Sequence, residues 1–252
     1  MNETKLPIWH TAWFSWRDGL RAARAMPKLA AIIFALILVD SSLDEFLRLD
    51  EFEEPVLWRQ ILRVAVVVPF TLFMAPLQIA FYRYLLLEEV SQGYVLDLAN
   101  SRFRMFFGYS AAVGVITAAC FYFVGSAGWL VDAFGIVAGV VVMLFTAMLF
   151  PAIAVDATAA NVMNAAGDLQ PLRALVIGLV ALLTWVLVPV LSLSVLLWKI
   201  ELPTPDAEQA AQVVILSVFG FVLEMIALVL SAQFYRAWAH RLGRPAGVTE
   251  KV

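Results

Sequence analysis

The chain has 252 residues, of which 63% are hydrophobic and 15% charged, and its mean hydropathy is +0.87. Soluble domains are about 45–50% apolar and about 25% charged, so the composition excludes a soluble globular protein and a disordered one. The long unbroken apolar runs also exclude an outer-membrane barrel, whose strands are short and alternating. One cysteine excludes an intramolecular disulfide, and a net charge of −3 gives no reason to expect a nucleic-acid partner.

These runs predict an all-α, polytopic membrane bundle of six helices with an interfacial helix before it. A membrane helix needs about 20 apolar residues, and five runs meet that length easily while the first is shorter. We expect an N-terminal helix over residues 1–28, a membrane domain over 29–235 and a short basic cytoplasmic tail over 236–252. The expected spans are Leu29–Leu43, Val64–Leu87, Met105–Val131, Ala133–Val155, Ala174–Trp198 and Val213–Tyr235.

The stretch from Ile8 to Lys28 predicts an amphipathic helix at the membrane surface. Aromatic and basic residues recur there at helical spacing in neighbouring stripes, and Pro27 ends the helix before the first span. Such a helix places its rings among headgroups and its cations on anionic phospholipid; the alternative is an anchor that only fixes orientation. The residues expected to contact headgroups or a partner are Trp9, Trp13, Trp16, Arg17, Arg21 and Arg24, together with Arg83 and Arg236 at the ends of two spans.

The segment after the first span is acidic, with seven carboxylates from Asp40 to Glu54. Ser42 and Glu45 fit a capping box, which predicts that a helix begins there. A solvated helix on the outer surface is the default interpretation. Binding of a divalent cation is the alternative, although the acids lack the spacing of a calcium loop.

The connections between the later spans carry the remaining topological signals. The third and fourth spans are expected to join in a tight turn around Asp132. The longer connections Glu88–Arg104 and Asp156–Arg173 are expected to form short helices at the membrane surface. With a cytoplasmic N-terminus, 13 Lys and Arg residues lie inside and 4 outside, which favours cytoplasmic placement of both termini.

Glu224 is the polar residue that we single out within a span. An ionised residue at the bilayer centre costs roughly 2.5–3.5 kcal/mol, so this carboxyl should be protonated, paired or in a wet cavity. It belongs to a small and polar stripe that should face other helices, namely Ser217, Gly220, Glu224, Ala227 and Ser231. A candidate proton or ligand site groups Glu224 with three threonines of similar depth, Thr117, Thr146 and Thr184. The alternatives are a protonated acid that only joins helices and an acid that faces lipid.

The organisation resembles that of the YciC-like family of bacterial inner-membrane proteins and of the membrane domain attached to some glycerophosphodiester phosphodiesterases. The likeness is greatest at Phe150–Asp156, an apolar helix end with a proline and a Val-Asp pair, and at Arg173 before the fifth span. The chain departs from the pattern between these points, where Asn161, Asn164, Gly167 and Pro171 replace serine and aromatic residues. The resemblance implies a six-span bacterial inner-membrane protein and supplies no reaction.

No catalytic motif stands out, since the zinc, nucleophile-elbow and phosphate-loop signatures are missing from the sequence. We therefore expect a non-enzymatic protein, without metal or cofactor, that organises, stabilises or regulates a partner membrane complex or local lipid. The expected partners are a bilayer containing anionic phospholipid and a membrane protein or second copy. The alternative is a small transporter or channel-like protein with a midplane site at Glu224; an enzyme acting on lipids ranks third.

Overall fold

The computed structural model describes residues 6–48, 57–122, 129–187 and 205–243. Within these ranges the chain forms helices and loops and no strand. Four helices are long and apolar enough to cross a membrane, and six if each of two bent helix pairs is one span. The prediction of an all-α protein with several helices that are long and apolar enough to span a membrane is confirmed, and the count of six spans stays a prediction.

The first two helices, α1 (Ile8–Ala25) and α2 (Pro27–Arg48), meet at an angle of 110°. Pro27 is the first residue of α2, where a missing N–H costs no intrahelical bond. The capping-box prediction is wrong, because α2 continues through Ser42. The Ser42 hydroxyl donates to the Leu38 carbonyl at 2.7 Å, as serines inside helices commonly do. The part of the acidic segment from residue 49 to 54 lies outside the described residues.

The helices α3 (Leu57–Leu87) and α4 (Ser101–Tyr122) pack closely against each other. The first of these contains the second expected span and ends at the predicted residue. A Cβ atom on Gly114 of α4 would lie 2.7 Å from Cγ1 of Val67. Glycine is therefore needed for the close approach of the two backbones, as small residues at membrane-helix interfaces allow.

The turn expected around Asp132 is wrong, because this residue lies in the first turn of α5 (Trp129–Thr146). The connection to α4 instead falls in residues 123–128, outside the described residues, where the sequence holds two glycines. A two-residue turn then separates α5 from the short helix α6 (Leu149–Ala154).

The two longer connections differ from each other. Residues 88–100 form no helix, which corrects the expectation for Glu88–Arg104; glycine at 93 and the β-branched Val90 and Val95 are poor helix formers. The other connection does contain a short helix, α7 (Val162–Asp168). The Asn161 side chain caps it by accepting from the Asn164 N–H at 2.8 Å.

The last part of the bundle consists of α8 (Pro171–Leu182), a π-helical turn η2 (Leu183–Leu187) and α10 (Pro205–Trp238). The fifth expected span therefore starts earlier than predicted, and its final residues lie outside the described ones. The sixth lies wholly within α10. The small and polar stripe of this span, predicted to face other helices, does so only in part. Ser217 is fully buried, and a Cβ on Gly220 would lie 2.9 Å from Cγ2 of Ile37 in α2, but Ala227 is exposed.

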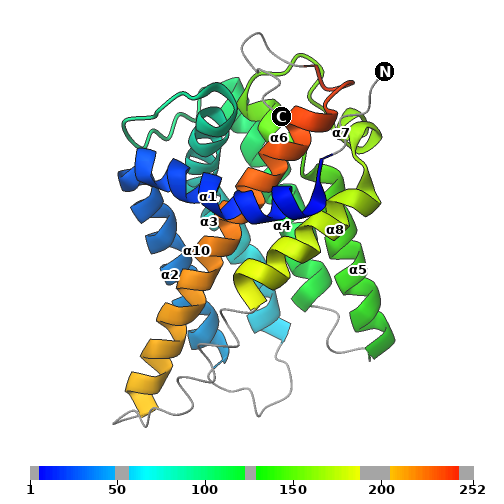
Figure 1. Ribbon diagram of the computed structural model, residues 1–252. Helices are drawn as coiled ribbons and strands as arrows, with labels where there is room; N and C mark the ends of the chain where they lie inside the picture. The colour runs from blue at the N-terminus through cyan, green and yellow to red at the C-terminus, as the bar shows by residue number, and fades with distance from the viewer. Residues whose placement is uncertain (1–5, 49–56, 123–128, 188–204, 244–252) are drawn as a thin grey trace.

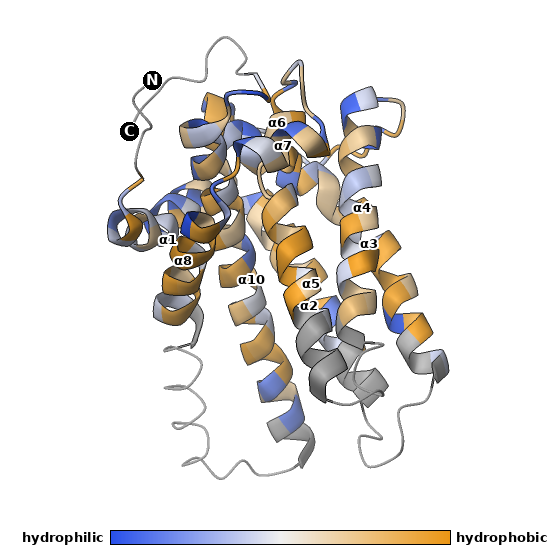
Figure 2. Cartoon of the chain, turned by 90° about the vertical axis from the view of Figure 1, so that its right-hand side faces the viewer, coloured by the Kyte–Doolittle hydropathy of each residue, from blue (hydrophilic) through white to orange (hydrophobic). Residues whose placement is uncertain are grey.

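At one end of the molecule the short helix α6 packs against α3, α4 and α10, and α7 packs against α5 (Figure 1); we call this the α6 end. Asp168 fixes the chain after α10 there by accepting from the N–H groups of Arg241 and Leu242 at 2.6 and 3.1 Å. Hydrophilic residues gather at this end, and apolar residues dominate the helices below it (Figure 2). Its fully buried side chains include Phe81, Phe106, Met148, Ile153, Tyr235 and Leu242.

Candidate functional site

The inner face of α1 consists of small residues, and it lies across α8 and α10 (Figure 1). The backbone of α1 comes close to α10 at Gly19, where a Cβ would lie 3.3 Å from Cβ of Met225. On the other side, the indole N–H of Trp185 donates to the Ala12 carbonyl at 3.0 Å. These contacts fix how α1 is rotated about its axis. The buried residues are Thr11, Ala12, Ser15, Gly19 and Ala22.

The outer face of α1 carries the predicted tryptophans in its first half and the predicted arginines in its second half. Trp9 is 75% exposed and Trp13 60% exposed. Trp16 is half-buried, with its ring stacked on Trp185 at a centroid distance of 6.0 Å. The arginines at positions 17, 21 and 24 are exposed. Aromatic and basic side chains therefore share one accessible surface, which we call the α1 outer face.

Glu224 has a partner that sequence reasoning missed. The amide Nε2 of Gln78 on α3 donates to Oε1 of Glu224 at 2.7 Å. Both side chains are half-buried, and the bond joins two helices that are long and apolar enough to cross a membrane. The signal was available, since Gln78 is an uncharged polar residue deep inside the second expected span.

The three predicted threonines do not bond to Glu224. Thr146 donates to the Val142 carbonyl and Thr184 to the Val180 carbonyl, each at 2.7 Å within its own helix. The Thr117 hydroxyl is buried and has no hydrogen-bond partner among the described residues. The arrangement thus brings together Glu224 and Gln78 and leaves the threonines apart from them.

Two more polar contacts join α3 to α10 on the α6 side of this pair. The Tyr82 hydroxyl interacts with the Ser231 side chain. The guanidinium group of Arg236 donates to the Leu85 carbonyl. Polar groups therefore line the interface between α3 and α10 from Glu224 to the α6 end.

Arg83 belongs to a cluster of four charged side chains at the α6 end. Its Nε donates to Glu89 at 2.7 Å, and its NH1 donates to the Ala154 carbonyl at 3.1 Å. Arg102 donates from Nε to Asp156 at 2.6 Å, which also lies 3.7 Å from NH1 of Arg83. The cluster is electrically balanced and ties the 88–100 loop to α3, α4 and the Val-Asp pair after α6.

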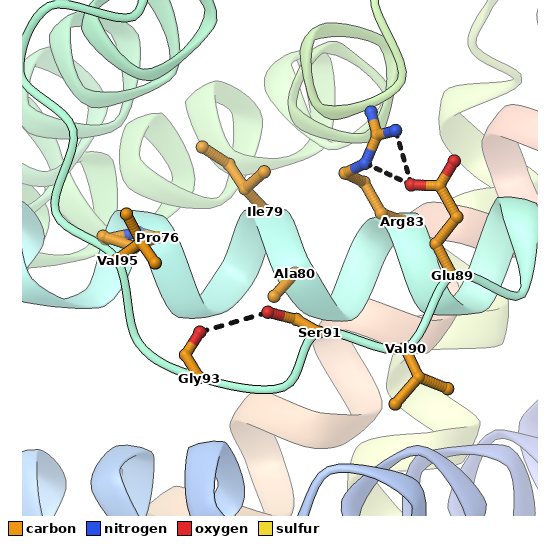
Figure 3. A pocket seen from close by; sticks show the side chains of 9 residues that line it. All are labelled: Pro76, Ile79, Ala80, Arg83, Glu89, Val90, Ser91, Gly93 and Val95. Atoms are coloured by element: carbon orange, nitrogen blue, oxygen red, sulfur yellow. Dashed lines mark hydrogen bonds and ion pairs between the residues drawn. The ribbon is translucent and has the colours of Figure 1, made fainter.

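A cavity of about 310 Å³ separates α3 from the 88–100 loop (Figure 3). Arg83 and Glu89 close one end of it, and Pro76 and Val95 lie at the other. The Tyr94 hydroxyl donates to the Phe73 carbonyl at 3.3 Å, and burial raises the pKa of this phenol. The loop is thus attached to α3 at two points.

No protein-family model, curated protein or solved structure matches the chain.

Proposed function

We propose that this chain is a non-enzymatic integral membrane protein that organises local anionic lipid, or a partner membrane complex, at the cytoplasmic side of a bacterial inner membrane. The observation that carries the proposal is the α1 outer face. Its exposed tryptophans and arginines lie on a helix whose rotation is fixed by buried contacts to α8 and α10. Interfacial helices combine these residue types, with rings at the headgroup level and cations on phosphates.

The distribution of charge supports this placement. Below the level of Gly19 and Met225, α10 runs back to Pro205 over 20 residues, which is about 30 Å of helix and matches the hydrocarbon thickness of a bilayer. The balanced cluster of Arg83, Glu89, Arg102 and Asp156 lies on the other side of α1, at the α6 end. Charged groups are thus placed where water and headgroups are available.

The test replaces two exposed arginines, Arg21→Gln with Arg24→Gln, and measures phosphatidylglycerol retained by the protein in native mass spectrometry. Each basic residue near an anionic surface contributes about 1 kcal/mol, so the double variant should bind this lipid about 30-fold more weakly. The matched control removes the same charge elsewhere, with Arg104→Gln and Arg241→Gln, both exposed. Equal retention by the two double variants would count against the proposal. A stoichiometric protein lost only from the α1 variant would identify the partner complex.

A second candidate function, a small transporter or channel-like protein, is supported by the bond between Gln78 and Glu224. Glu224→Gln keeps a side chain of the same shape and removes the ionisable group, so proton flux into vesicles should be abolished. Unchanged flux would reject this candidate. The first candidate is favoured because Met225 touches α1. If α1 is interfacial, the adjoining Glu224 lies nearer the headgroups than the midplane that a transport site would occupy.

A further inference from the structure

The 88–100 loop exposes apolar side chains although it lies at the charged end of the molecule. Val95 is 71% exposed and Leu98 57% exposed. The seven residues from Val90 to Leu96 include no charge. Exposed apolar patches of this kind mark surfaces that contact a membrane or another protein, so the depth of the loop decides which contact is available.

The loop does not project away from the bundle but turns back along α3 (Figure 3). Its start is held at Arg83 through Glu89, and Tyr94 reaches the carbonyl of Phe73, ten residues earlier in the helix. Ten residues of helix are about 15 Å. Val95 therefore lies beside Pro76, where both line the cavity.

This position places the loop at the same depth as α1. Pro76 precedes Gln78 by two residues, and Gln78 bonds to Glu224. The next residue of α10, Met225, is the one that α1 crosses at Gly19. Val95 and the α1 outer face thus lie at one level of the molecule.

We propose that residues 90–96 are a second membrane-contacting element, which inserts Val95 into the headgroup layer of the leaflet that α1 occupies. The occupant of this surface is phospholipid. The inference rests on the proposed function, because α1 is the marker of membrane depth. Residues 89–96 are in no helix or strand, so their backbone groups need water or headgroups as partners, which the hydrocarbon core does not supply. Insertion is therefore shallow.

The experiment labels Val95→Cys in a Cys120→Ser background with an environment-sensitive fluorophore, in vesicles of phosphatidylethanolamine and phosphatidylglycerol. Because the Val95 side chain is exposed, the substitution removes little packing. Nitroxides on the lipid headgroup should quench this label roughly twofold more than nitroxides at the chain end, as expected for burial near the headgroup boundary.

Two reference positions separate the outcomes. His10→Cys on α1 should follow Val95, and Thr158→Cys, exposed between α6 and α7, should respond only to aqueous iodide. Quenching at His10 without quenching at Val95 overturns the loop inference and leaves the proposed function standing. Quenching at neither overturns the proposed function. The loop inference is also overturned in three further cases. These are a Val95 label that responds to iodide alone, one that responds most strongly to the chain-end nitroxide, and one that responds to no quencher because protein covers it.

Discussion

Arg83 and Arg236 occupy equivalent places, each after a Phe-Tyr pair at the end of a long helix. Both guanidinium groups donate to a carbonyl near the C-terminus of another helix, Ala154 at the end of α6 and Leu85 near the end of α3. The last carbonyls of a helix have no partner within it, and a cation there also favours the helix dipole. Each of these two guanidinium groups therefore donates a hydrogen bond to a backbone carbonyl inside the protein.

We predict that Arg236→Leu lowers the free energy of unfolding by about 1–3 kcal/mol, because the carbonyl of Leu85 loses a charged donor in a partly buried place. Unfolding in detergent micelles, followed by circular dichroism, measures the change. Arg104→Leu is the control, since Arg104 is exposed on α4. A loss at position 236 no greater than at position 104 would contradict this account.

The bond between Gln78 and Glu224 makes a separate prediction. Gln78→Leu removes the amide that donates to the carboxyl and should cost about 1–3 kcal/mol of stability, because a polar group in a low-dielectric place is left unpaired. Glu224→Leu should cost less in the Gln78→Leu background than in the wild type. If the two substitutions are additive in a double-mutant cycle, the bond contributes nothing measurable.

At the scale of elements, two glycines of α4 provide a matched comparison. Gly114→Ala should destabilise the pair of α3 and α4 by about 1–3 kcal/mol, because the added Cβ meets Val67 at 2.7 Å. Gly108→Ala meets nothing within 4 Å and should be neutral or slightly stabilising, since alanine favours helix. Melting temperatures of the purified variants test both. An equal shift of the melting temperature in the two variants would show that helix propensity alone determines the effect of both substitutions.

Helix boundaries can be predicted from the sequence where they are determined by neighbouring residues, and not where they depend on packing between helices. The end of α3 at Leu87 and the start of α2 at Pro27 follow from apolar length and proline geometry, which are local. The capping box at Ser42 failed because a capping signal is equally compatible with a serine inside a continuing helix. The partner of Glu224 is not predictable from spacing, because it depends on how α3 is rotated against α10.

At the scale of the whole molecule, orientation in the membrane is the testable property. The positive-inside rule predicts that the α6 end is cytoplasmic. In a Cys120→Ser background, an impermeant maleimide should therefore label Thr158→Cys in inverted membrane vesicles and not in intact spheroplasts. Asp50→Cys, in the segment expected outside, should give the opposite pattern. Labelling of Thr158→Cys from the outer side would reverse the assigned orientation.

The position of α1 has a consequence for synthesis. Gly19 docks on Met225, and these residues are separated by about 200 positions, so α1 leaves the ribosome well before the segment on which it docks. At about 5–20 residues per second, the delay is about 10–40 s. Until α8 and then α10 have been made, the small-residue face of α1 stays uncovered. The native contacts of α1 therefore form long after α1 itself has been made.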